Sequence, residues 1–258
     1  LRAKRGQAPL DPAVIDAVVA KFEAKFPGQT RIRFRSSTNA EDLGTFTGAG
    51  LYNSQTGHTD RPLGTDGAID WAIKEAWLNI WNPRAYEERG YYGIEQHACA
   101  MALLTTPNFK DEEANGVAIT NNIFDTTGVE PAFYVNVQIG ENEVVQPELG
   151  VLPDAYLHYF YYPGSPVTYI THSTLIPAGE TVLTAIQIQA LGVALDAIHE
   201  RFYDVYGNDG EWYGMDVEFK FDDKLDPGNP PTLFIKQARP FPWNPGESDI
   251  MGSGECEP

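Results

Sequence analysis

Cysteine is scarce in this sequence. Its 258 residues include two cysteines, Cys99 within an apolar run and Cys256 close to the C-terminal end. Two cysteines placed in this way predict neither a disulfide framework nor a cysteine-ligated metal site. They leave the redox compartment undetermined.

Long apolar runs are also lacking. No stretch approaches the roughly 20 apolar residues that a membrane-spanning helix needs, and residues 1–10 lack the apolar centre of a signal peptide. We therefore expect no membrane span and a cytoplasmic location. Because the chain begins with Leu1 rather than Met, we expect a fragment or processed product, with upstream sequence that could hold a targeting signal or another domain.

Basic residues are few relative to acidic ones. The chain has 18 Lys and Arg against 36 Asp and Glu, a formal net charge of -18. Nucleic acid and anionic membrane surfaces would repel such a chain, which excludes loose binding to either of them. A phosphate ligand would need a local cluster of arginines, with a divalent cation to offset charge.

What the sequence does contain is alternating helical and strand patterns. At 42% hydrophobic residues it can bury a sizeable core. Asp11 and Pro12 start a helix that we expect to end at Gly28, and residues 31–36 alternate as a half-buried strand. Residues 37–67 are rich in Gly, Thr, Asn and Asp, and we expect a long functional or disordered loop there.

The remaining elements follow from periodicity and turn residues. We predict helices at 69–81, continued at 85–89, and at 183–206 with Gly207 as C-cap. Predicted strands cover 98–104, 116–120, 133–139, 157–162, 214–221 and 232–237, and 242–258 reads as a flexible tail. The predicted fold class is α+β, with a mixed, largely antiparallel sheet flanked by helices.

The two closing strands carry paired polar residues. Asp216 and Glu218 alternate with apolar residues and therefore share one face. A hairpin would set Gln237 and Arg239 of the partner strand beside them. Carboxylate and amide oxygens suit Mg²⁺, and the planar fork of an arginine suits phosphate. The alternative reading is an ordinary amphipathic hairpin with a solvated charged face.

The early strand places Arg31, Arg33 and Arg35 on one face, opposite Ile32 and Phe34. Three arginines that point together could form the local cluster that a phosphate requires. The alternative is an edge strand protected from aggregation by its charges.

Several ordered blocks resemble one family. They read Arg35-Ser-Ser-Thr-Asn-Ala-Glu-Asp-Leu43 with Gly50-Leu-Tyr52, Trp77-Leu-Asn-Ile-Trp-Asn-Pro-Arg84-Ala, Gly116-Val-Ala-Ile-Thr120, Asp216-Val-Glu218 and Gln237-Ala-Arg239-Pro240. This series is similar to the ATP-grasp ATP-binding domain of the phosphoenolpyruvate synthase, pyruvate phosphate dikinase and glucan water dikinase family, also called the PEP/pyruvate-binding domain. The resemblance implies an ATP-grasp-like fold over 31–241, preceded by a helical segment at 1–30.

The resemblance also implies a function and a site. Such a domain binds Mg²⁺-ATP in a dikinase-type phosphotransferase, which passes a phosphoryl group to a histidine carrier and then to a pyruvate- or glucan-like acceptor. Glu218 and Gln237 would hold Mg²⁺-ATP, and Arg35 and Arg239 would contact the transferring phosphate. Further nucleotide contacts implied by the motifs are Arg84, Asp216 and Glu141, of which Glu141 matches a Gly-Leu-Gly-Glu turn only through Gly140-Glu141.

Two family features have no counterpart in this sequence. No Gly-Lys nucleotide lobe precedes Arg31, and no phosphohistidine domain is recognisable, so we expect both as partners in cis or in trans. A degenerate module that binds nucleotide or a partner without turnover is an alternative. Carbohydrate binding through aromatic residues 156–162 is another, although such residues also form sheet cores. His172 fits either a phosphorylated or a structural histidine.

Overall fold

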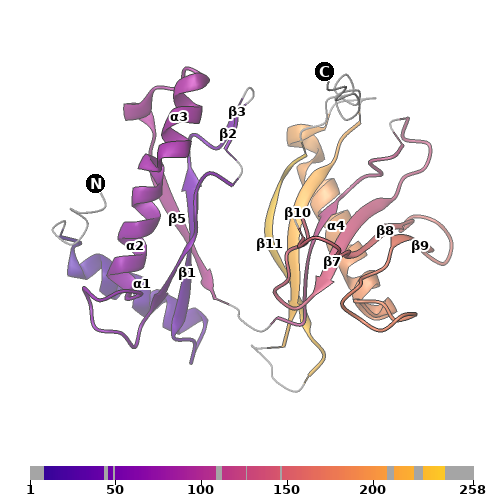
Figure 1. Ribbon diagram of the computed structural model, residues 1–258, viewed down its shortest axis with the longest axis horizontal. Helices are drawn as coiled ribbons and strands as arrows, with labels where there is room; N and C mark the ends of the chain where they lie inside the picture. The colour runs from indigo at the N-terminus through magenta and orange to yellow at the C-terminus, as the bar shows by residue number, and fades with distance from the viewer. Residues whose placement is uncertain are drawn as a thin grey trace, which may run out of the picture. The chain divides into compact units, whose positions relative to one another are not determined.

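The computed structural model divides the chain into two compact units, Leu1–Asn108 and Phe109–Pro258, called unit 1 and unit 2 below (Figure 1). It describes residues 9–43, 46–48, 50–108, 112–125, 127–145, 147–207, 212–223 and 229–241. The predicted tail at 242–258 lies outside the described residues. The boundary between the units falls within 31–241, and the helix predicted in the first 30 residues belongs to unit 1.

Unit 1 is a three-stranded antiparallel sheet in the order β4-β1-β5, packed with helices. Its elements in chain order are α1 Pro12–Lys25, β1 Arg31–Thr38, β2 Asp42–Leu43, β3 Phe46–Thr47, β4 Gln55–His58, α2 Ile69–Leu78, the 3₁₀ helix η2 Asn79–Trp81, α3 Pro83–Tyr91, the 3₁₀ helix η3 Gln96–Ala98, and β5 Met101–Pro107. The short strands β2 and β3 pair with each other.

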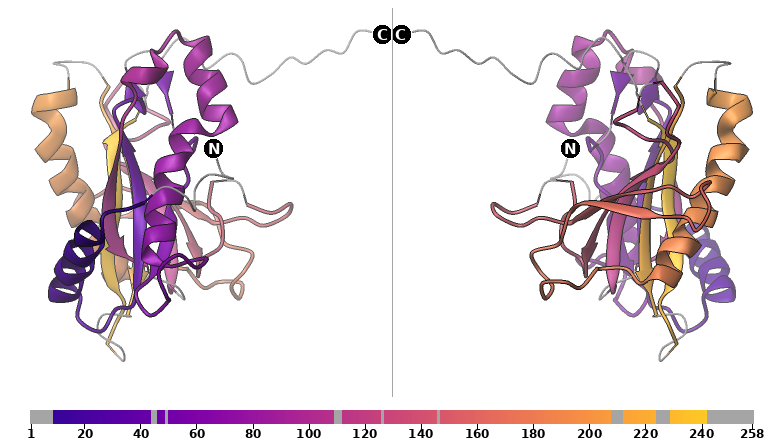
Figure 2. Two further views of the ribbon diagram at one scale, coloured as in Figure 1. Left: turned by 90° about the vertical axis from the view of Figure 1, so that its left-hand side faces the viewer. Right: turned by 90° about the vertical axis from the view of Figure 1, so that its right-hand side faces the viewer.

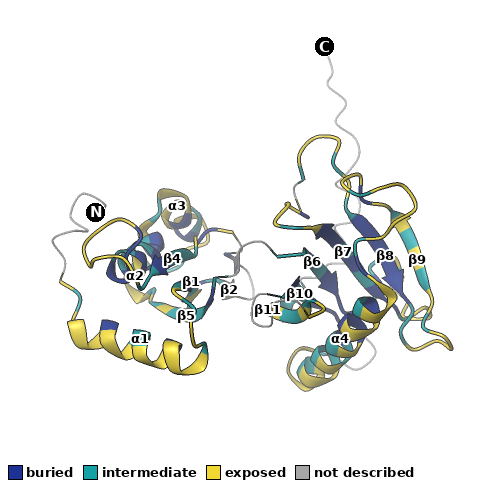
Figure 3. Cartoon of the chain, turned by 90° about the horizontal axis from the view of Figure 1, so that it is seen from below, coloured by how far each residue is buried: buried dark blue, intermediate teal, exposed yellow. Residues whose placement is uncertain are grey.

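The core of unit 1 lies between the sheet and two helices. Ile32 and Phe34 of β1 are buried against α1 and α2, where Phe22 and Ile73 join them. The side chain of Asp11 caps α1, as predicted, by accepting a hydrogen bond from the Ala13 backbone N–H. Most of α1 is exposed, as Figure 3 shows, so α1 is a surface helix that covers one face of the sheet.

The predicted long loop at 37–67 was wrong in part, because it contains three short strands. Among them, β4 pairs with β1 and packs on α2. At Gly57 an added Cβ would lie 3.0 Å from the Ala72 Cβ and the Ile69 Cα. A glycine is therefore required for this close approach, and it removes the apolar signal that would have identified the strand. The first helix also ends at Lys25, before Gly28.

Unit 2 is a six-stranded antiparallel sheet in the order β11-β10-β6-β7-β8-β9. Its elements are β6 Ala114–Ile119, β7 Phe133–Ile139, β8 Asp154–His158, β9 Val167–Thr171, α4 Ala185–Tyr206, β10 Met215–Asp222 and β11 Thr232–Pro240. The strand predicted at 157–162 is wrong by several residues, since β8 ends at His158. Strand β9 was not predicted.

One face of this sheet is covered by α4 (Figure 2). Leu191 and Leu195 of α4 pack on Val217 and Phe219 of β10, and all four side chains are buried. The α+β class and the largely antiparallel sheet are thus confirmed. Within the described ranges, no helix has both the length and the apolar character that crossing a membrane requires.

The start of α4 is held by a reciprocal cap. The Thr184 hydroxyl accepts from the Gln187 N–H, and the Gln187 side chain accepts from the Thr184 N–H. We expect Thr184→Ala to lower the free energy of unfolding by about 1 kcal/mol, measured by urea titration. The control is Gln189→Ala at an exposed position in the second turn of α4, which should not destabilise because alanine is the better helix former. Equal losses in both variants would contradict the capping role.

Candidate functional site

The closing hairpin brings together four of the predicted site residues. In the β10–β11 ladder, Asp216 lies opposite Arg239 and Glu218 lies opposite Gln237. The pairing predicted from alternation is therefore confirmed. Both Nε and Nη2 of Arg239 donate to Oδ2 of Asp216, at 2.9 Å and 2.8 Å. This contact fixes the plane of the guanidinium, so its orientation is set by the fold.

A β-bulge follows the Glu218–Gln237 pair. The register shifts between Glu218 and Phe219, and Lys236 has no residue opposite it in β10. Its ammonium group lies 4.0 Å from Oε2 of Glu218, with both side chains partly exposed. Bulges commonly redirect a side chain beside a functional site. Here the bulge adds a positive charge beside the one carboxylate that was predicted to bind metal.

The same face continues across β6 and β7. The β6 residues next to Asp216 and Glu218 are Ile119 and Val117, and in the next strand Tyr134 and Asn136 follow. Directly paired residues in antiparallel strands point to the same side. The face opposite α4 therefore has charged groups at its β10–β11 edge and two apolar residues next to them in β6, a combination that can accept a ligand with a flat ring and an anionic tail.

The solvated-hairpin reading does not describe the far end of β10. Lys220 and Asp222 are 3% and 1% exposed, and the Lys220 ammonium lies 3.5 Å from Glu112 and 3.4 Å from Asp222. Burial lowers the pKa of Lys220, an effect that these carboxylates oppose. Burial likewise raises the pKa of Glu112, and Lys220 opposes that shift. Removing one partner of such a buried ion pair leaves an uncompensated buried charge and is strongly destabilising.

An acidic cluster that was not predicted lies at the same end. Carboxylate oxygens of Glu113, Asp222 and Asp223 are all within 4.8 Å of one another. The Asp223 N–H also donates to Glu113 at 3.1 Å. The adjacent acidic pairs at 112–113 and 222–223 were the available sequence signal, and their meeting depends on the β10–β6 pairing. Lys220 already offsets the charge of Asp222.

Arg84 and Arg35, both predicted phosphate contacts, belong to unit 1. Arg84 lies on α3 with 71% of its side chain exposed, and its Nε donates to Glu88 at 2.9 Å. This is an ordinary surface ion pair one helical turn apart. Arg35 lies on β1, partly buried, on the same face as Arg31 and Arg33. The buried arginine of α3 is Arg89, which the motif comparison did not indicate.

Glu141, the seventh predicted site residue, lies in the turn after β7 and is exposed. Gly140 before it has φ +68, and its N–H donates to the Glu113 carbonyl at 2.9 Å. A glycine is required at Gly140 because other residues rarely adopt this backbone conformation. The partial motif match at Gly140-Glu141 therefore coincides with a tight turn.

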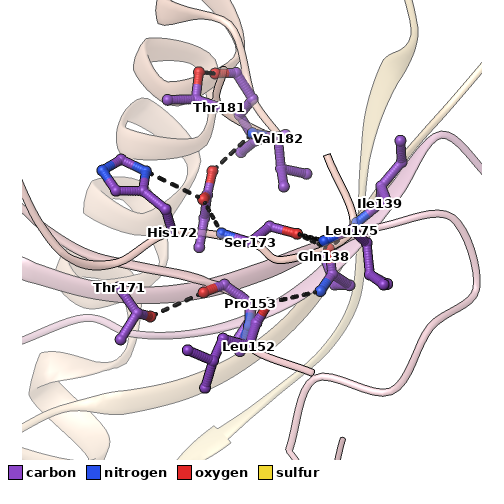
Figure 4. Close-up of polar contacts among 12 residues, drawn as sticks. Gln138, Ile139, Leu152, Pro153, Thr171, His172, Ser173, Leu175, Thr181 and Val182 are labelled. Atoms are coloured by element: carbon purple, nitrogen blue, oxygen red, sulfur yellow. Dashed lines mark hydrogen bonds and ion pairs between the residues drawn. The ribbon is translucent and has the colours of Figure 1, made fainter. Parts of the chain in front are cut away.

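His172 lies next to a buried polar cluster around Asp154, part of which is drawn in Figure 4. Its Nδ1 lies 3.6 Å from Oδ1 of Asp154, a fully buried carboxylate, and its ring stacks on Tyr169 at 4.6 Å. Asp154 accepts hydrogen bonds from the backbone N–H groups of Ser173 and Val182. These contacts tie the segment after β9 to the end of β8, which favours the structural reading of His172.

The aromatic residues at 156–162 are divided between the core and the surface. Tyr156 and Phe160 pack in the core of unit 2, while Tyr161 and Tyr162 are exposed. The Tyr161 hydroxyl donates to Asp196 of α4 at 2.7 Å. The aromatic stretch therefore forms the end of β8 and a following turn, and it does not present a continuous exposed stripe for stacking on sugars.

A scan against models of protein families and a search of curated proteins found no match to this chain. The family resemblance consequently rests on the motif series from Arg35 to Pro240.

Proposed function

We propose that unit 2 carries the Mg²⁺-ATP-binding face of a dikinase-type phosphotransferase, which passes a phosphoryl group from ATP to a histidine carrier. The observation that carries the proposal is the hairpin register, which sets Glu218 beside Gln237 and Asp216 beside Arg239. These are the residues that the Asp-x-Glu and Gln-x-Arg-Pro resemblance assigns to nucleotide and metal.

The donor set fits the implied metal ion. Mg²⁺ prefers oxygen ligands, commonly one or two from the protein together with phosphate oxygens and water. Glu218 supplies a carboxylate and Gln237 an amide oxygen from facing positions in the ladder. Asp216 is held by Arg239, so Glu218 and Gln237 are the residues that would hold the ion. A bound ion would supply charge neutralisation for the phosphate chain.

The role of Arg239 in this proposal is to orient the phosphate. Its fork is fixed by Asp216 before any ligand arrives, which lowers the entropic cost of phosphate binding. Positioning and charge neutralisation provide most of the catalysis in phosphoryl transfer. The apolar residues Val117 and Ile119 beside Glu218 and Asp216 would contact the nucleobase or ribose. The motif resemblance supports Arg35 as a phosphate contact. The surface ion pair of Arg84 with Glu88 and the exposed position of Glu141 give no structural support for the nucleotide contacts predicted for Arg84 and Glu141.

Isothermal titration of the full chain tests this proposal. We expect Mg²⁺-ATP to bind, and Glu218→Gln to weaken it about tenfold to a hundredfold, which corresponds to one hydrogen bond or ligand contact of a charged group. ATP binding in EDTA should change little in this variant, because Glu218 acts through the metal. The matched control is Glu200→Gln on the exposed face of α4.

Absence of Mg²⁺-ATP binding in the unsubstituted chain would overturn the proposal. So would equal affinities in Glu218→Gln and Glu200→Gln. Transfer of a phosphoryl group from ATP to an added histidine carrier, assayed with the same samples, separates an active phosphotransferase from a module that binds without turnover.

A further inference from the structure

Three of the four strands at the ends of the two main sheets are protected against pairing with a further strand. The three-stranded sheet ends in β4 and β5, and the six-stranded sheet ends in β9 and β11. Strand β4 has four residues, and its last, His58, bridges to Ala68. The β8–β9 ladder has a register shift between Ala155 and Tyr156, and β11 carries its bulge at the charged Lys236. Short strands, bulges and charged side chains all prevent edge-to-edge association.

The edge strand β5 lacks this protection. It pairs with β1 over seven residues without a register shift, and its one proline, Pro107, stands at its last position. The chain has no charged residue from 98 to 108. The side chain of Leu104, at the middle of the strand, is exposed. A long, regular and uncharged edge strand is an expected site of association with another strand.

The hydrogen bonds at the two ends of β5 show which of its backbone groups face outward. The Asn108 N–H donates to the Arg31 carbonyl, and the Asn39 N–H donates to the Ala100 carbonyl. Residues 100 and 108 therefore direct their backbone groups toward β1, and so do the alternate residues between them. The N–H and C=O groups that point away from β1 belong to Met101, Leu103 and Thr105. In the described part of the chain, no hydrogen bond uses these outward groups.

We propose that β5 is the interface with a second copy of this chain, in which two β5 strands pair antiparallel about a two-fold axis at Leu103. In this register Met101 of each copy lies opposite Thr105 of the other, and the two Leu103 residues face each other. Every outward N–H and C=O group at these three positions then gains a partner. The two sheets become one continuous sheet in the order β4-β1-β5-β5-β1-β4. This interface is independent of the nucleotide site proposed for unit 2.

The side chains in this register are complementary. Ala102 of each copy lies opposite Leu104 of the other, so a small side chain meets a large exposed one on the same face. Pro107 is the next residue in the series of outward positions after Thr105. Because proline has no N–H, the ladder ends there.

The distribution of charge favours a second copy over a foreign peptide. In a chain with 36 acidic residues and a net charge of -18, an edge that recruited a basic peptide would be expected to carry acidic side chains. The run from 98 to 108 carries none. A symmetric contact has the opposite requirement, because any charge at the edge would meet the same charge of the other copy.

Sedimentation velocity of the full chain over a range of concentrations tests the proposal. We expect a monomer–dimer equilibrium that shifts toward the dimer as salt is added, because salt screens the repulsion between two acidic chains. Leu104→Lys should weaken the dimer about tenfold or more, since it places like charges on both sides of the axis. Leu63→Lys is the matched control, because it makes the same change at an exposed position outside β5.

A second variant tests the backbone pairing without a change in charge. Thr105→Pro removes one outward N–H and should also weaken the dimer, whereas the β1–β5 ladder does not use that group. The circular dichroism spectrum of each variant, compared with that of the unsubstituted chain, separates loss of the dimer from loss of the fold.

Hydrogen exchange locates the interface. The amides of Met101, Leu103 and Thr105 should exchange slowly at concentrations that favour the dimer and rapidly after dilution. Those of Ala102 and Leu104 should stay protected in both states, because they donate to β1.

A chain that stays monomeric at every concentration overturns the proposal, and slow exchange of the three outward amides in that monomer would assign the edge to a segment of the chain itself. Equal dimerisation of Leu104→Lys and Leu63→Lys also overturns it. Glu218→Gln should dimerise like the unsubstituted chain, so failure of the nucleotide site and failure of this interface give different results.

Discussion

Replacing Asp154 with alanine is expected to lower the free energy of unfolding by about 3–5 kcal/mol, as is typical when one member of a buried charged network is removed. Asp154 is fully buried at the start of β8. Its Oδ1 accepts from the Ser173 N–H at 2.8 Å and its Oδ2 from the Val182 N–H at 2.7 Å. Alanine leaves the buried Ser173 N–H and the partly buried Val182 N–H without this acceptor.

Urea unfolding followed by circular dichroism measures this loss. Asp154→Asn should lose less, because the amide oxygen can still accept from one of the two N–H groups. Asp204→Asn, at an exposed position of α4, should change the free energy of unfolding by no more than about 0.5 kcal/mol. Hydrogen exchange adds a local test, since the amides of Ser173 and Val182 should lose protection first. An unfolding midpoint of Asp154→Ala equal to that of Asp204→Asn would refute the structural role.

The sequence could not indicate this role, because β8 does not look like a strand with a buried face. Its residues on the core side are Asp154, Tyr156 and His158, and two of the three are polar. Alternation of apolar and polar residues, on which strand prediction depends, is therefore absent. Because the residues at 159–162 are aromatic and favour strands, the predicted strand was placed too far toward the C-terminus.

The closing hairpin was predictable for the opposite reason. Met215, Val217 and Phe219 face the core and alternate with Asp216 and Glu218, so the strand, its two faces and its pairing all follow from the residue pattern. The bulge at Lys236 was not predictable, because it is a one-residue register shift within the β10–β11 ladder. The buried state of Lys220 was not predictable either, because it depends on β6 lying next to β10 and on Glu112, which lies just before β6.

The motif comparison did not identify the buried arginine of α3. The motif comparison selected Arg84, which is 71% exposed, whereas Arg89 on the same helix is fully buried. Periodicity assigns α3 as a helix, but burial of one of its polar residues depends on the acceptors that neighbouring segments provide. For Arg89 these acceptors come from three places outside the α3 helix, and none of them is acidic.

Arg89→Met is therefore expected to be one of the most damaging substitutions in unit 1, with a loss of about 3–5 kcal/mol in the free energy of unfolding. Arg89 Nε donates to Gln96 Oε1 at 3.0 Å, Nη1 to the Tyr52 hydroxyl at 2.8 Å and Nη2 to the Ile80 carbonyl at 2.5 Å. The substitution leaves these three acceptors without the donor that joins them, although methionine preserves much of the apolar volume.

Two variants make the Arg89 prediction specific. Arg89→Lys keeps the positive charge but cannot reproduce the three-way fork, so it should lose a large part of the same free energy. Arg84→Met removes a charge of the same kind from the same helix at an exposed position, and its pair with Glu88 should be worth no more than about 0.5 kcal/mol. Chemical unfolding of the three variants compares them directly. If Arg89→Lys is as stable as the unsubstituted chain, charge alone holds this junction; if Arg84→Met and Arg89→Met lose equally, the buried fork contributes nothing.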